Sequence, residues 1–166
     1  MNHFQKRSLE GLFKAYSRGM YNICLRMIGN QADAEDVLQD AFIQAYMKIN
    51  QLQSKDRFGA WLKRIVINQC LQFLRSRILF VDINDEYDLE PEEERSISTF
   101  SMNRINYEIQ QLPDGCRIVF NLFLLENYSH KEVADMLNIS ESTSKSQYQR
   151  ARKLLQQRLK DVKTNG

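Results

Sequence analysis

Residues 129–155 carry the clearest chemical pattern in the sequence. Ser129 and Glu132 have the spacing of a capping box, in which the serine caps a helix and the glutamate bonds back to its backbone. Residues 138–140 then predict a tight turn, and Ser140 caps a longer basic helix. This succession predicts a helix-turn-helix, whose second helix enters the DNA major groove. The candidate contacts of that helix are Ser142, Thr143, Ser144, Lys145, Ser146, Gln147 and Arg150.

These side chains have the chemistry of base and phosphate recognition. Lys145 and Arg150 can pair with phosphates or guanine, and Gln147 can read adenine. The same pattern also fits a structural pair of helices with a solvated polar face, and that alternative stays open.

A second candidate is a polar and basic ridge on one face of the helix predicted over residues 58–75. Arg64, Asn68, Gln72 and Arg75 follow one another at steps of 4, 4 and 3, with Lys63 beside them. Phe58 and Trp61 stand at the start of this helix, and aromatic rings next to cations suit stacked, single-stranded bases. A solvated face over core aromatics is the competing interpretation.

A third candidate is an acidic and amide face on the helix predicted over residues 34–49. It comprises Asp36, Gln39 and Asp40, with Ile43 adjoining. Taken alone, such a face is most often a solvent-exposed helix surface with no binding role.

No pattern in the sequence indicates catalysis. There is no P-loop, no Gly-rich nucleotide fingerprint and no GxSxG, and the scattered Cys24, Cys70 and Cys116 fit buried, reduced thiols. His130 lies on a turn that we expect to be exposed. We therefore expect no catalytic residue, metal, cofactor or small-molecule substrate, and no enzyme activity.

Helical periodicity runs through both halves of the chain, which predicts an all-α fold. Apolar residues at helical spacing predict one long helix, or two joined near Gly19, over residues 9–27, and a buried face formed by Ala34, Val37, Leu38, Ala41, Phe42, Ala45, Tyr46 and Ile49. The third helix should bury Phe58, Trp61, Leu62, Ile65, Val66, Cys70 and Phe73. A second inward stripe should comprise Cys116, Val119, Phe120, Phe123 and Leu124. We expect two small helical domains, residues 1–79 and 101–166, joined by an acidic flexible linker over 80–100.

Charge follows the same division. Residues 1–77 carry a net charge of +6, residues 78–103 carry −7 and residues 104–166 carry +3. Two basic blocks thus lie on either side of an acidic segment, and basic blocks of this kind suggest a polyanion partner. The first residues lack the apolar stretch of a signal peptide, and no apolar run reaches membrane-spanning length, so we expect a cytoplasmic protein.

Three segments resemble the bacterial sigma-70 family of RNA polymerase sigma factors, and specifically its small extracytoplasmic-function (ECF) group. Residues 33–42 resemble the core-binding helix of sigma region 2, and residues 58–68 resemble its promoter-melting and minus-ten segment. Residues 112–152 resemble region 4, which is a helix-turn-helix. The resemblance covers nearly the whole chain except the linker.

The resemblance implies a role for each candidate surface. Asp36, Gln39, Asp40 and Ile43 would bind the clamp helices of the largest subunit of core RNA polymerase. The loop before Trp61, with Lys63, Arg64 and Asn68, would hold the unwound minus-ten strand, and the minus-thirty-five element would contact Thr143, Lys145, Ser146 and their neighbours. Core polymerase and promoter DNA are thus the implied partners of a chain that is a monomer when free, and an anti-sigma factor is a further one. Gln72, Ser144 and Gln147 depart from the family pattern, which bears on base preference.

Two other functions are compatible with the motifs themselves. A conventional helix-turn-helix regulator would bind an operator without polymerase. A protein that only titrates another regulator would make no DNA contact through Thr143 or Lys145.

Overall fold

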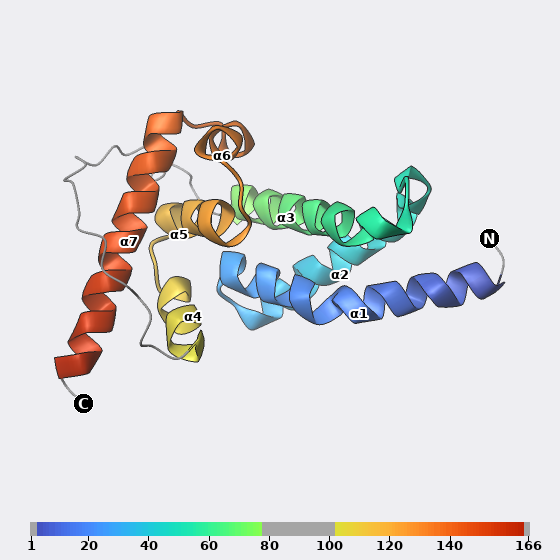
Figure 1. The fold of residues 1–166 in the computed structure, drawn as a ribbon, viewed down its shortest axis with the longest axis horizontal. Helices are drawn as coiled ribbons and strands as arrows, with labels where there is room; N and C mark the ends of the chain where they lie inside the picture. The colour runs from blue at the N-terminus through green and yellow to red at the C-terminus, as the bar shows by residue number, and fades with distance from the viewer. Residues whose placement is uncertain (1–2, 78–101, 165–166) are drawn as a thin grey trace. The chain divides into compact units, whose positions relative to one another are not determined.

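The computed structural model describes residues 3–77 and 102–164, and the linker predicted over residues 80–100 lies outside the described residues. The chain divides into two compact units, Met1–Arg77 and Ile78–Gly166, and each is treated by itself. All regular secondary structure in the described residues is helical, which confirms the predicted fold class (Figure 1).

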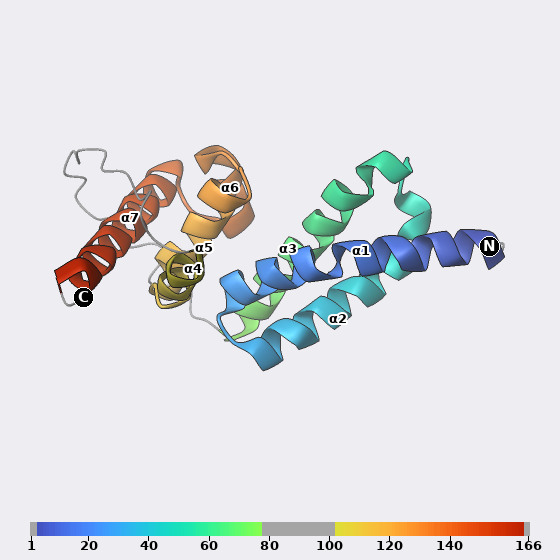
Figure 2. The ribbon, with the colours of Figure 1, turned by 60° about the horizontal axis from the view of Figure 1, so that its bottom comes forward.

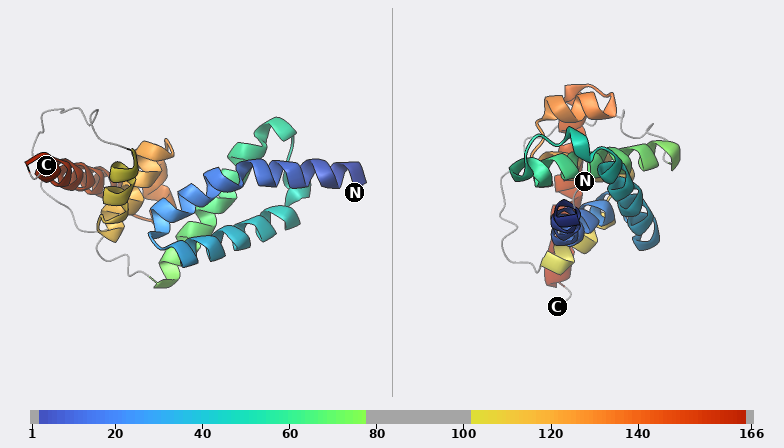
Figure 3. Two further views of the ribbon diagram at one scale, coloured as in Figure 1. Left: turned by 90° about the horizontal axis from the view of Figure 1, so that it is seen from below. Right: turned by 90° about the vertical axis from the view of Figure 1, so that its right-hand side faces the viewer.

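Unit 1 is built on three helices: α1 (His3–Ile28), α2 (Gln31–Met47) and α3 (Phe58–Arg77). Of the two alternatives for the first helix, the structure has the single, continuous one. Helices α1 and α2 lie side by side, and α3 packs on both (Figures 2 and 3). Two short 3-10 turns, Ile49–Gln51 and Lys55–Arg57, form the connection that leads from α2 into α3.

The turn between α1 and α2 follows from two residues. Gly29 has φ 79°, a left-handed conformation in which a glycine has no Cβ to clash. Asn30 then caps α2, because its side-chain oxygen accepts a hydrogen bond from the backbone N–H of Asp33 at 3.0 Å.

Small residues on α2 allow the three helices to approach closely. Ala34, Val37, Ala41 and Ala45 are buried and recur every three or four residues along α2. They meet a core that includes Cys24 and Met27 of α1 and Leu62, Val66, Cys70 and Leu74 of α3. Such dense packing is the main source of the unit's stability.

The predicted inward faces of α2 and α3 were partly wrong. Tyr46 is 47% exposed, and Leu38, Phe42 and Ile49 are only half-buried. On α3, Trp61, Ile65 and Phe73 are also half-buried, whereas Ile67 and Leu71 are buried. Apolar residues spaced by three and four positions form a wide stripe along a helix. Only the residues at the centre of that stripe face the neighbouring helices, so those at its edges stay partly exposed.

Unit 2 contains α4 (Met102–Gln110), α5 (Asp114–Phe120), α6 (His130–Leu137) and α7 (Glu141–Thr164). Pro113 precedes α5, and one turn of π-helix, Asn121–Leu125, extends it. The core is formed by Ile109, Leu112, Cys116, Phe120, Ala151 and Leu155. Leu124, expected to face inward, is 44% exposed, because the wider π turn rotates the residues that follow Phe120.

The predicted helix-turn-helix elements are confirmed. The Ser129 hydroxyl accepts from the Glu132 backbone N–H at 3.1 Å, and a Glu132 side-chain oxygen accepts from the Ser129 N–H at 2.7 Å. Asn138 ends α6 in the left-handed conformation with φ 55°, and the Ser140 hydroxyl caps the backbone N–H of Thr143 at 3.0 Å. Within the described ranges, no helix is both long and apolar enough to cross a membrane.

Candidate nucleic-acid interface

Helix α2 presents the predicted acidic and amide face to solvent. Asp36, Gln39 and Asp40 are exposed, and Ile43, one helical turn beyond Gln39, is 52% exposed. The half-exposed isoleucine beside charged and amide groups offers both apolar and polar contacts on one face. These four side chains are accessible together on one helix.

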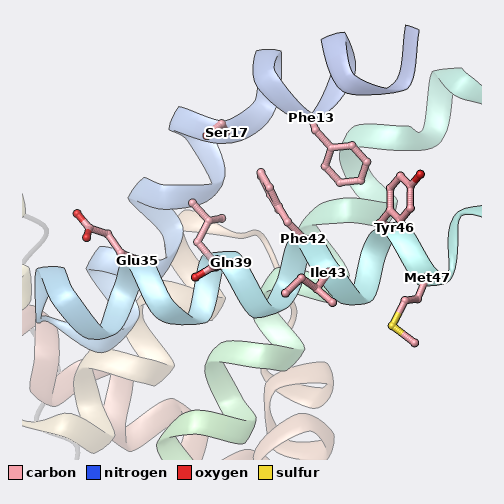
Figure 4. A pocket seen from close by; sticks show the side chains of 9 residues that line it. Phe13, Ser17, Glu35, Gln39, Phe42, Ile43, Tyr46 and Met47 are labelled. Atoms are coloured by element: carbon pink, nitrogen blue, oxygen red, sulfur yellow. The ribbon is translucent and has the colours of Figure 1, made fainter. Parts of the chain in front are cut away.

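This face continues into an apolar groove between α1 and α2, which no pattern in the sequence predicted. The groove has a volume of about 550 Å³ (Figure 4). It is lined by Phe13, Ser17, Glu35, Leu38, Gln39, Phe42, Ile43, Tyr46 and Met47. Met47, which is 72% exposed, and Tyr46 stand at one end. Apolar side chains left open beside carboxylates suit an amphipathic helix that carries basic residues.

The ridge on α3 is exposed as predicted. Arg64, Asn68, Gln72 and Arg75 are all exposed, and Lys63 is half-buried beside them. Because their spacing keeps them on one side of α3, they form a polar and basic strip on the side away from Leu62, Val66 and Cys70. The strip can meet phosphates and base edges along its whole length.

Phe58 does not belong to this exposed surface, and its assignment as a DNA contact was wrong. It is fully buried. Its ring lies 5.2 Å from that of Phe13, 5.5 Å from Tyr16 and 5.9 Å from Trp61. The first residue of α3 is buried because the short 3-10 turns fold the chain back over α1, which encloses the ring. Trp61, half-buried, keeps part of its surface accessible.

A second hollow lies where the loop before α3 meets α1. It has a volume of about 430 Å³ and is lined by Ser8, Leu9, Leu12, Ile49, Asn50, Leu52 and Lys55. The Lys55 ammonium donates a hydrogen bond to the Ser8 hydroxyl at 3.3 Å, which ties the loop to α1. The hollow combines apolar walls with amide and cationic groups. A planar, polar-edged ligand such as a nucleobase has matching chemistry.

Fewer of the predicted contact residues on the recognition helix α7 are exposed than the sequence indicated. Ser142 and Lys145 are exposed and Arg150 is half-buried. Lys145 Nζ lies 3.5 Å from the Glu141 carboxylate, an exposed pair that holds the lysine only weakly. Gln149, which was not among the predicted contacts, is half-buried. It falls one turn after Lys145, so helical spacing from Ser142 would have found it.

Thr143, Ser144, Ser146 and Gln147 were predicted to be DNA contacts, but the structure buries their side chains, with exposed fractions of 4%, 0%, 3% and 0%. The hydroxyls of Thr143 and Ser146 are engaged locally. Thr143 Oγ1 accepts from Ser140 at 2.8 Å, and Ser146 donates to the Thr143 carbonyl at 3.0 Å. Gln147 lies on the same side of α7 as Ala151 and Leu155, at steps of four, and therefore points inward.

His130 joins α6 to the recognition helix. Its Nδ1 lies 2.8 Å from the Ser144 hydroxyl, and its ring stacks on Phe123 with a centroid distance of 3.9 Å. Burial, then the nearby Lys145 charge, lowers the pKa of His130, and Glu141 opposes this shift. The expected exposed turn is thus a half-buried contact, because the Phe123 and Tyr148 rings cover the imidazole.

Comparison with known proteins points to one family for this chain. Residues 12–78 match the family model for Sigma-70 region 2, and residues 102–155 match that for Sigma-70, region 4. The ECF RNA polymerase sigma factor SigW of Bacillus subtilis is 30% identical over 89% of this chain and 86% of its own length. ECF sigma factor SigM of the same organism is 27% identical over 96% of this chain and 97% of its own length.

A solved structure has the same fold. It is the sigma factor RpoE in complex with the anti-sigma factor NepR from Bartonella quintana, with a TM-score of 0.59 and 18% identity. The match covers 93% of this chain and 98% of that one. Both region models match in order, and SigW is 30% identical over most of both chains. The chain therefore belongs to the ECF group of the sigma-70 family of RNA polymerase sigma factors.

Proposed function

We propose that this sigma factor divides its work among three separate surfaces on α2, α3 and α7. Unit 1 binds core polymerase and holds the minus-ten strand, and unit 2 reads the minus-thirty-five element. The observation that carries the proposal is the exposed face of α2, where Asp36, Gln39, Asp40 and Ile43 adjoin an open apolar groove.

Core polymerase binds along this α2 face. Carboxylates and an amide suit charge-assisted hydrogen bonds to basic residues of the polymerase's clamp helices, and Ile43 supplies apolar contact. Exposed Tyr46 and Met47 extend the apolar part of the surface. Apolar contacts on this face supply affinity for the polymerase, and the polar groups fix the position of the bound helices.

The α3 ridge and the loop before it hold the unwound minus-ten strand. Arg64 and Arg75 meet phosphates, Asn68 and Gln72 offer amides to base edges, and Trp61 provides a ring for stacking. The 430 Å³ hollow under the loop receives a flipped base, since its apolar walls and the Asn50 and Lys55 groups match a base's face and edge. Phe58 supports this surface from beneath.

The minus-thirty-five element is read by Ser142, Lys145, Gln149 and Arg150 on α7. The small Ser142 permits close approach of the helix, and Lys145 and Arg150 pair with phosphates or guanine. Thr143, Ser146 and Gln147 support the helix rather than read the DNA.

Two further features complete the proposal. An anti-sigma factor is a partner of this chain, since the similar RpoE structure contains one, and the open groove on α2 is a suitable docking place. The protein acts as a non-catalytic, monomeric subunit in the cytoplasm, where polymerase and promoter DNA meet.

The test is run-off transcription with purified core polymerase and a promoter library, together with a separate measurement of core association. Gln39→Ala/Asp40→Ala should abolish both transcription and core association. Arg64→Ala/Arg75→Ala should retain core association but lose open complexes. Glu10→Gln, which removes an exposed acid from α1, is the matched control and should leave both unchanged.

Two results would contradict the proposal. If the α2 double variant binds core polymerase like the natural chain, the assignment of this face is wrong. If no transcript depends on the protein while it alone retains a defined duplex from the library, it is instead a conventional helix-turn-helix regulator.

A further inference from the structure

Two of the three cysteines meet inside unit 1. Cys24 lies on α1 and Cys70 lies on α3, 46 positions apart in sequence, yet their sulfurs are 3.7 Å apart. Both side chains are fully buried, and neither cysteine is in a disulfide bond. The sequence predicts buried, reduced thiols at these positions, and the spacing along the chain gives no sign that the packing of α1 on α3 brings the two together.

We propose that Cys24 and Cys70 are an oxidation site, at which a disulfide forms inside the region 2 bundle and joins α1 to α3. The sulfurs are already in van der Waals contact. A disulfide bond is about 2.05 Å long, so the two atoms must approach by about 1.7 Å, which side-chain rotation and a small shift of the helices can supply. Each thiol has the other as its reaction partner within the folded chain.

The reaction is a two-electron oxidation by a peroxide or by a small-molecule disulfide. One thiolate attacks the oxidant: a peroxide O–O bond breaks and leaves a sulfenic acid, or a disulfide bond breaks and leaves a mixed disulfide. The second sulfur then displaces water or the small thiol, and the S–S bond forms. Both S–H protons leave, and the oxidant is reduced to two waters or to two thiols.

The disulfide would raise the stability of unit 1 and would alter the exposed surfaces of α2 and α3 much less. Cys70 lies on the side of α3 opposite the exposed Asn68 and Gln72, and Cys24 lies on the buried side of α1. The link closes a long loop, which includes all of α2, and restricts the unfolded chain. Because both thiols are buried, the oxidant reaches them through local opening of the bundle, so the reaction is slow without denaturant.

Cys116 supplies an internal control. It is buried in unit 2, where its sulfur donates to the Pro113 carbonyl at 3.3 Å and burial raises the pKa of its thiol. No second thiol lies in that unit's described part, so it has no partner for an internal disulfide. A protein that oxidises only at contacting thiols should leave Cys116 reduced.

The experiment treats the full chain with hydrogen peroxide or oxidised glutathione at stoichiometric concentrations, followed by non-reducing peptide mapping. We expect a linked pair of peptides that contain Cys24 and Cys70, lighter by two hydrogen atoms than the reduced pair, and a monomeric protein. The midpoint of thermal unfolding of unit 1, followed through Trp61, should rise by about 10 °C and return to its starting value with a reductant. Cys116→Ala should behave like the natural chain.

Cys24→Ala and Cys70→Ala should each lose the linked peptides and the rise in melting temperature. The unmodified chain keeps the test decisive if either variant folds poorly. The proposal is overturned if the natural chain yields only Cys116-linked dimers, or if the thiols of the folded protein stay reduced until it unfolds. It is also overturned if the linked product melts no higher than the reduced protein.

Discussion

Gly59, in the first turn of α3, provides a sharp test of how the DNA-reading part of unit 1 is positioned. A Cβ added at this residue would lie 2.8 Å from Cε1 of Tyr16 and 3.0 Å from both Cζ and the hydroxyl oxygen of that ring. Tyr16 also packs against Phe58, at 5.5 Å between ring centroids. Because Gly59 has no side chain, the Tyr16 ring of α1 can pack directly against the start of α3, next to the loop that precedes it.

Gly59→Ala should destabilise unit 1, although alanine is the better helix former. Relief of the closest contact, at 2.8 Å, needs a displacement of about 0.7 Å, since carbon atoms prefer about 3.5 Å, and overpacking of this kind costs about 1–3 kcal/mol. The gain in helix propensity is at most about 1 kcal/mol. The expected net loss in the free energy of unfolding is about 1 kcal/mol.

The sign should reverse when Tyr16 is removed. In a Tyr16→Ala background the obstructing ring is absent, so Gly59→Ala should stabilise the unit by about 0.5 kcal/mol through helix propensity. A coupling energy of about 1–3 kcal/mol between the two positions follows, in the range seen for residues in direct contact. Gly19→Ala on α1 is the matched control, because an added Cβ there meets nothing within 4 Å.

Urea unfolding followed by tryptophan fluorescence measures this directly. Trp61 is the single tryptophan in the sequence and belongs to unit 1, so the signal reports on that unit alone. With a slope of about 1–3 kcal/mol per M, Gly59→Ala should lower the midpoint by roughly 0.3–1 M. A higher midpoint for Gly59→Ala, or the same change in both backgrounds, would refute the role assigned to Tyr16.

Three further predictions concern the helix-turn-helix of unit 2. Ser129→Ala removes the capping-box acceptor for the Glu132 N–H and should lower the stability of unit 2 by about 1–2 kcal/mol in chemical denaturation, whereas an unchanged midpoint would show that the cap contributes nothing. Asn138→Ala should cost about 1 kcal/mol because alanine tolerates φ 55° poorly, while Asn138→Gly should be close to neutral; equal losses would contradict the backbone argument. The pKa of His130 is lower in the folded protein than in the unfolded chain. As the pH falls, the unfolded chain therefore takes up a proton at this histidine before the folded protein does. Stability measured by thermal melting should therefore fall as the pH drops below about 6.5, and His130→Gln should lack this fall.

The sequence by itself determined the elements of this protein. Periodicity and capping residues predicted the helical stretch over residues 9–27, the Ser129 cap, the turn at Asn138 and the exposed ridge from Arg64 to Arg75, because each depends on residues a few positions apart. The matched segments also identified the family.

Tertiary packing decided which side chains of those elements reach solvent. Phe58 and Gln147 occupy positions that look accessible along the sequence, yet neighbouring helices enclose them, while Tyr46 falls on a predicted inward stripe and is half-exposed. The groove beside Ile43 and the contact between Cys24 and Cys70 arise from residues of different helices. Local spacing fixes the direction of a side chain on its own helix, but only the arrangement of the neighbouring helices determines what that side chain meets.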